Sequence, residues 1–147
     1  MQPLPVWAKL VREGKALPHA WHSLIDHSAD VPAVFEAIVQ LPVVKSRLAA
    51  LAGESRLPEV WLNRLAVYAA LHDFGKANNG FQARWHADAP AVGHVGPALG
   101  LIYCGEEFAN QIKVALPISE LTEWSAFEQA FLSVVAHHGR PMDPEKA

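Results

Sequence analysis

Residues 58–76 read PEVWLNRLAVYAALHDFGK, and their spacing predicts a helix. Its proline suits the first turn of a helix, and apolar residues recur behind it at helical spacing: Leu62, Ala66 and Ala69. Asp73 falls on the same stripe, so the pattern places a carboxylate on the buried face, where it needs a cation or several donors. We expect a helix over residues 58–74 whose last turn carries His72 and Asp73 inward and which Gly75 ends.

Residues that typically start or end helices also occur on both sides of this stretch. We expect four further helices, over residues 28–41, 44–52, 96–108 and 121–138. Ser28 or Asp30 is the candidate cap of the first, which leaves His27 at the helix mouth, and the last delivers His138 at its carboxyl end. Because no segment alternates polar and apolar residues as a strand does, the predicted fold class is all-α, a compact helical bundle.

The composition fits one globular domain in the cytoplasm. The chain has 147 residues, of which 51% are hydrophobic and 18% charged, so a packed core is expected. No apolar run approaches the roughly 18 residues that cross a bilayer, and the first residues lack a secretion signal, so we expect no membrane contact. The single Cys104 excludes an internal disulfide framework and fits a reducing compartment. A net charge of -3 excludes a protein that coats duplex DNA, so any nucleic acid binds locally.

Histidine is the unusual feature of the composition, with eight in the chain. Helix ends and mouths present six metal-binding residues: His27, His72, Asp73, His94, His137 and His138. Imidazole and carboxylate groups bind Mn, Fe, Co and Ni, and additional oxygen ligands favour Mg. An adjacent His-Asp pair suits two ions about 3.5 to 4 Å apart, which polarise a phosphate and activate water. We therefore expect one or two divalent metal ions as the cofactor.

A purely structural interpretation competes with this one. A single histidine on an apolar face is usually a hydrogen-bonded core residue, so neither His27 nor His94 alone indicates a metal site. Lys76 follows Asp73 closely and could simply neutralise its charge. Only the joint pattern of helix-end histidines around one aspartate favours metal binding.

The residues around Asp73 resemble a known signature. His72-Asp73-Phe74-Gly75-Lys76 is similar to the HD-x-G-K signature of the HD superfamily of metal-dependent phosphohydrolases. Further blocks resemble, in order, the HD nuclease domain of the CRISPR-associated type I helicase-nuclease: residues 27–31, 76–77, 81–82, 93–94 and 136–139. The dipeptide alone arises easily by chance, whereas the ordered blocks extend over roughly residues 20–141 and make the resemblance specific.

The resemblance implies ligands, a substrate and partners. One ion would be held by His27, His72 and Asp73, and a second would be held or approached by Asp73, His94, His137 and His138. Asp73 and Lys76 would be the catalytic residues, with Lys76 facing a substrate phosphate. The implied activity is metal-dependent nicking and degradation of single-stranded DNA. The implied partners are an RNA-guided CRISPR surveillance complex and a helicase domain or subunit.

The carboxyl terminus departs from the family pattern. The family has a further aspartate on a helix well beyond the His-His pair, but this chain has nine residues after His138. Asp143 lies in a proline-flanked tail, and we do not assign that role to it. We expect residues 1–147 to form a single HD nuclease domain that lacks its C-terminal helices and the helicase portion. In agreement, the chain has no G-x-x-x-x-G-K-[ST] phosphate loop.

Residues outside the matched blocks are interpreted as surface or supporting groups. Three histidines belong here: His19, His22 and His86. Asp30 either supports a ligand histidine or caps a helix, and Arg84 is one of several scattered cations that could contact a DNA backbone. Trp85 is the best candidate for stacking on an unpaired base.

Two other functions stay open at this point. A phosphohydrolase of nucleotides or cyclic dinucleotides would use the same metal core with a closed pocket, and it would turn over small substrates without cleaving DNA. A catalytically incomplete fragment would act as a docking module, and it would bind its partner without bound metal. Metal content and substrate range discriminate among the three functions.

Overall fold

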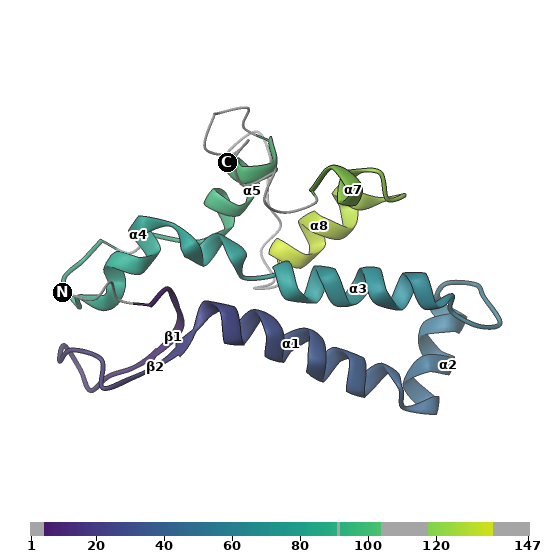
Figure 1. Cartoon of the computed structure of the whole chain (residues 1–147), viewed down its shortest axis with the longest axis horizontal. Coiled ribbons are helices and arrows are strands. Elements are labelled where there is room, and N and C mark those ends of the chain that lie inside the picture. Colours follow the sequence, from purple (N-terminus) through teal and green to yellow (C-terminus); the bar gives the residue numbers. More distant parts are fainter. Residues whose placement is uncertain (1–4, 91, 104–117, 137–147) are drawn as a thin grey trace.

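The computed structural model describes residues 5–90, 92–103 and 118–136 of the chain (Figure 1). It is mainly helical, which confirms the predicted fold class, and it adds one short hairpin. The strands are β1 (Trp7–Val11) and β2 (Ala20–Ser23). The α-helices are α1 (Leu24–Val39), α2 (Pro42–Leu51), α3 (Glu59–Leu71), α4 (Asn79–Gln82), α5 (Val95–Tyr103), α7 (Ile118–Thr122) and α8 (Phe127–Val135). Two 3₁₀ turns, η1 (Phe74–Ala77) and η2 (Ala83–Trp85), flank α4.

Helices α1 and α3 lie side by side and antiparallel, and α2 joins them at one end (Figure 1). One apolar core holds that end together: Val39, Ala49, Leu57 and Leu62. A second core packs α5, α7 and α8 around the other end of α3: Tyr68, Ala98, Leu99, Leu121, Phe127, Phe131 and Val135. Because the two long helices are antiparallel, the amino end of α1 meets the carboxyl end of α3. Those ends carry His27 and His72.

The β1-β2 hairpin was not predicted from the sequence. Its strands are antiparallel, with Lys9 opposite His22, and the register shifts between Trp7 and Lys9. This irregularity buries Trp7 and Ala8 in succession, which removes the alternation by which a strand is recognised. A two-stranded hairpin is marginal by itself, so contacts with the rest of the chain must hold it.

Several predicted helix boundaries are wrong. The first helix begins at Leu24 rather than Ser28, so His27 lies inside its first turn. The long helix ends at Leu71, and the chain continues in the 3₁₀ turn η1 instead of reaching Phe74 as α-helix. The predicted helix over residues 121–138 is divided between α7 and α8 in its described part, up to residue 136, because Ala126 adopts a left-handed conformation at φ 58° between them.

Ser23, rather than Ser28 or Asp30, caps α1. Its hydroxyl accepts a hydrogen bond from the backbone N–H of Asp26 at 3.1 Å and donates one to the Asp26 carboxylate at 2.5 Å. The acidic group also lies in the first turn, where it interacts favourably with the helix dipole. The cap therefore fixes the turn that carries His27.

Replacing Ser23 with alanine is expected to lower the free energy of unfolding by about 1 kcal/mol, because the first turn loses its side-chain cap. Chemical denaturation monitored by circular dichroism measures this change. Ser28→Ala is the matched control, since Ser28 lies inside the helix, where alanine is the better helix former. Equal losses in the two variants would contradict the assignment of the cap.

Within the described ranges, no helix is both long enough and apolar enough to cross a membrane.

Candidate metal centre

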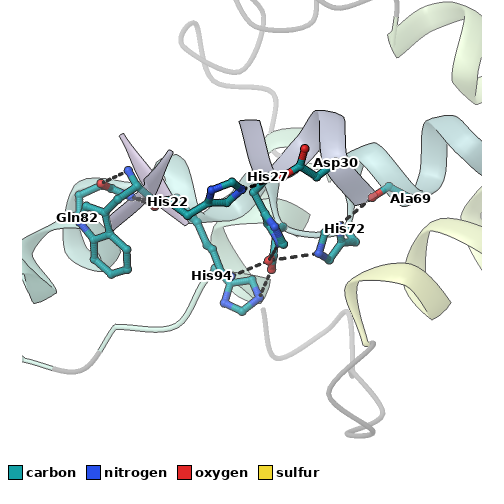
Figure 2. Close-up of polar contacts among 10 residues, drawn as sticks. His22, His27, Asp30, Ala69, His72, Gln82 and His94 are labelled. Atoms are coloured by element: carbon teal, nitrogen blue, oxygen red, sulfur yellow. Dashed lines mark hydrogen bonds and ion pairs between the residues drawn. The ribbon is translucent and has the colours of Figure 1, made fainter. Parts of the chain in front are cut away.

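The Asp73 carboxylate is the centre of a buried polar cluster. Asp73 lies between α3 and η1 in the chain, and it is 3% exposed. One carboxylate oxygen, Oδ2, contacts His27 Nε2 at 3.1 Å, His72 Nε2 at 3.2 Å and Lys76 Nζ at 2.5 Å. The other oxygen, Oδ1, lies 3.2 Å from His94 Nε2. The imidazoles of His27, His72 and His94 therefore surround this carboxylate, and Figure 2 labels all three.

Four different segments deliver these side chains. His27 comes from the first turn of α1, and His72 follows the last residue of α3. Lys76 lies in η1, and His94 directly precedes α5. The predicted convergence of His27, the His72-Asp73 pair and His94 is therefore present in the structure, although these three positions are far apart in the sequence.

Gly75 permits the approach that brings His94 to the site. A Cβ atom at this position would lie 2.0 Å from the His94 backbone oxygen and 2.8 Å from the Ala98 Cβ. Only a residue without a side chain can occupy the contact between η1 and the start of α5. Gly75 thus acts in packing, and its predicted role of ending the long helix is wrong, because α3 ends at Leu71 and Gly75 lies inside η1.

The hydrogen bonding of His72 identifies a place for a cation. Its Nδ1 lies 2.7 Å from the Ala69 backbone oxygen, which can only accept, so Nδ1 donates. In the neutral ring, Nε2 then directs a lone pair at the Asp73 carboxylate, which also only accepts. The imidazole must carry a second proton, or a metal ion must lie between the two groups. A histidine oriented by a backbone carbonyl is the usual arrangement of a metal ligand.

The electrostatics keep Asp73 ionised. Burial alone raises the pKa of this carboxyl, but hydrogen bonds with His72, His94 and Lys76 outweigh burial and hold the pKa far below its usual range. The hydrogen bond to Asp73 raises the pKa of His72. Burial lowers the pKa of His27, which favours the neutral form that binds metals. The cluster is centred on an ionised carboxylate that pairs with the Lys76 ammonium and has imidazoles on both of its sides.

The donor set fits a divalent metal. His27, His72 and Asp73 each offer one ligand atom, and these atoms all lie within 4.8 Å of one another. Two nitrogens and one oxygen suit borderline first-row ions. The two carboxylate oxygens face different histidines, His27 and His72 on one side and His94 on the other. This division is what a carboxylate shared by two ions requires.

The remaining predicted site residues are placed as follows. Lys76 contacts Asp73 in this structure, as the purely structural interpretation expected, and its predicted contact with a substrate phosphate stays a prediction. His137 and His138 lie outside the described residues. Asp30 pairs with His22 at 3.0 Å, and the His22 ring lies 5.8 Å from that of His27. His22, interpreted as a surface or supporting group, therefore borders the cluster on one side (Figure 2).

Two amide side chains build the surroundings of the site: Gln82, which lies in a matched block but had no predicted role, and Asn78, which was not singled out in the sequence. Gln82 accepts from the Trp7 backbone N–H at 3.0 Å and donates to the backbone oxygens of Trp7 and Lys76 at 2.9 and 2.7 Å. It thereby joins β1 to the turn that carries Lys76. Asn78 caps α4 by accepting from the Phe81 N–H at 2.8 Å and also donates to the Gly75 oxygen at 2.7 Å. Only the Asn-x-x-Phe capping pattern could have been found from the sequence.

Comparison with known proteins agrees with this geometry. A family model described as "Cas3, HD domain" matches residues 7–147, nearly the whole chain. Neither the curated proteins nor the solved structures gave a significant match. The family implies metal-dependent nuclease activity and association with the CRISPR interference machinery, and the buried group of His27, His72 and Asp73 is consistent with its metal site. The resemblance seen in the ordered sequence blocks is thereby confirmed, and the chain belongs to the Cas3 HD domain family.

Proposed function

We propose that this domain hydrolyses phosphodiester bonds of single-stranded DNA during CRISPR interference, with one or two divalent ions as cofactor. The observation that carries the proposal is the Asp73 carboxylate, which is buried, ionised and faced by three imidazoles. A domain that only docks onto a partner has no need for such a group, because burying it is costly.

Each residue of the cluster has a proposed role. His27, His72 and Asp73 hold one ion, and Asp73 with His94, His137 and His138 holds or approaches a second. Bound divalent ions supply charge stabilisation at a phosphate and lower the pKa of water. The Ala69 carbonyl keeps His72 oriented toward the site. Lys76 neutralises Asp73 without metal, and we propose that its ammonium turns to a substrate phosphate when a cation takes that place.

The biological setting follows from the family. We propose that an RNA-guided surveillance complex opens the DNA and that a helicase domain or subunit delivers the single strand. This setting is cytoplasmic. That residues 1–147 form one HD nuclease domain belongs to the same proposal.

Removing the metal tests the function. Protein stripped with EDTA is expected to lose cleavage of a labelled single strand, and adding Mn²⁺, Co²⁺ or Ni²⁺ is expected to restore it, because imidazole and carboxylate ligands bind these ions and release any bound proton when they do. Gel analysis of the products and elemental analysis of the protein measure both changes. Cleavage that persists in EDTA would contradict the proposal, and so would turnover of cyclic dinucleotides without any cleavage of DNA.

A further inference from the structure

A hollow of about 800 Å³ leads to the metal centre. One wall is β1 with the turn that follows it, and the other is the segment from η1 to the residues before α5. Lys76 and His94 line the hollow, and both contact Asp73. The hollow therefore ends at two side chains that contact the carboxylate directly, Lys76 and His94.

The hollow gathers positive charge. Five of the twelve lysines and arginines of the chain line it: Lys9, Arg12, Lys15, Lys76 and Arg84. None of the described residues that line it is acidic, although the whole chain has a net charge of -3. Asp88 pairs with Lys15 at 3.2 Å, but both side chains are 85% exposed, so this pair neutralises little. The positive charge is concentrated at this hollow, so the net charge of the whole chain does not indicate it.

The two walls are held in a fixed relation by hydrogen bonds. The side-chain amide of Gln82 binds the Trp7 backbone on the opposite wall twice: its oxygen accepts from the Trp7 N–H, and its nitrogen donates to the Trp7 carbonyl oxygen. The Arg12 guanidinium donates to the Arg84 backbone oxygen, and the Trp7 and Phe81 rings pack at 4.8 Å. The Arg84 guanidinium lies 4.9 Å from the centre of the Phe81 ring. A ligand bound between these walls has little of the protein to order, which favours affinity.

Lys9 connects this hollow with a second one of about 410 Å³. His27 lines the second hollow together with His22 and Asp30. Figure 2 shows the pair of His22 and Asp30 next to His27. The two hollows thus reach different histidines of the cluster, His94 in the first and His27 in the second. Lys9 lies at the wall common to both.

We propose that the larger hollow is a groove that binds the sugar-phosphate backbone of the strand beside the cleaved phosphate. Lys9 on one wall and Arg84 on the other bind phosphates, while Arg12 holds the walls together. The cations are distributed over both walls, which suits a polyanionic strand better than the single phosphate cluster of a nucleotide. This inference rests on the proposed function for the identity of the strand. It adds the surface by which a protein of negative net charge binds an anion.

Binding without cleavage tests the groove. We compare the wild type with Lys9→Gln/Arg84→Gln by fluorescence anisotropy on a labelled 12-nucleotide single strand in EDTA, which prevents hydrolysis. The double variant is expected to bind about tenfold more weakly at low salt, and its slope of log K against log salt should fall by about 1.4, since about 0.7 is lost per phosphate contact. Both side chains are exposed, and the Arg84 backbone oxygen that accepts from Arg12 is retained.

The matched control is Lys45→Gln/Arg47→Gln on α2, which removes the same two charges away from the hollow. It is expected to bind within about twofold of the wild type because net charge alone contributes little at this distance. The groove is disproved if the two double variants bind equally, or if the wild type does not bind the strand. A groove variant that binds normally while the wild type cleaves DNA with Mn²⁺ overturns the groove and leaves the nuclease. A groove variant that binds weakly while the wild type cleaves nothing supports the groove and overturns the nuclease.

Discussion

Replacing Asp73 with alanine is expected to remove bound metal and to reduce single-strand cleavage at least on the order of a thousandfold, the scale on which loss of one charge-stabilising group acts. Asp73 is the one carboxylate that contacts His27, His72, His94 and Lys76 within the described part of the chain. Without it the imidazoles lose their common anionic partner. Elemental analysis and cleavage rates at saturating Mn²⁺ measure the two losses.

The alanine variant also leaves the Lys76 ammonium and nearby imidazoles without their buried counter-charge, a change that costs about 3 to 5 kcal/mol. Asp73→Asn loses the same charge but keeps the shape and one acceptor oxygen for Lys76, so it disturbs the fold less than alanine does and isolates the effect of the charge better. We expect a normal helical circular dichroism spectrum from it with the same loss of metal and cleavage. Asp88→Asn, at the exposed ion pair with Lys15, serves as the control and should cleave normally. Full activity in Asp73→Asn would eliminate the proposed metal centre.

The ring around Asp73 was predictable because its members carry local signals. His27 and His94 lie next to helix starts, and His72 lies at a helix end, where capping residues, proline and glycine mark the boundary. Helix ends in a bundle gather at common faces, so boundary histidines were expected to meet. The burial of Asp73 followed from the apolar stripe of α3, even though the α-helix stops two residues before it.

The surroundings of the site were not predictable in the same way. The β1-β2 hairpin depends on Gln82, which is 75 residues away from Trp7 in sequence, and no local pattern announces so distant a hydrogen bond. The irregular pairing near Trp7 also hides the alternation of a strand. The basic hollow was missed for the same reason, since Lys9 and Arg84 look like scattered surface cations until the hairpin places them on facing walls.

Gly75 belongs partly to each of these two groups of features. The sequence signature includes this glycine, but the structural reason why glycine is required there could not be predicted from the sequence. A glycine after a helix is usually a stop signal, but the φ of Gly75 is not in the left-handed region, unlike those of Gly14 and Gly53. What requires glycine is the His94 backbone oxygen, 2.0 Å from where a Cβ would stand. A backbone atom cannot move aside as a side chain can, so any substitution must displace the start of α5.

Replacing Gly75 with alanine is therefore expected to lower the free energy of unfolding by about 3 kcal/mol, the upper part of the usual overpacking range, and the melting temperature by roughly 10 °C. The displaced segment carries His94, so metal affinity should also fall about 10- to 100-fold, as when a supporting contact of a ligand is lost. Gly96→Ala is the matched control, because the residue is inside α5 and, among the described residues outside its own helix turn, its added Cβ meets no atom within 4 Å. The control should melt at or slightly above the wild-type temperature, since alanine favours the helix. Thermal denaturation and metal titration of both variants provide the measurements, and equal melting temperatures would mean that η1 and α5 do not meet at Gly75.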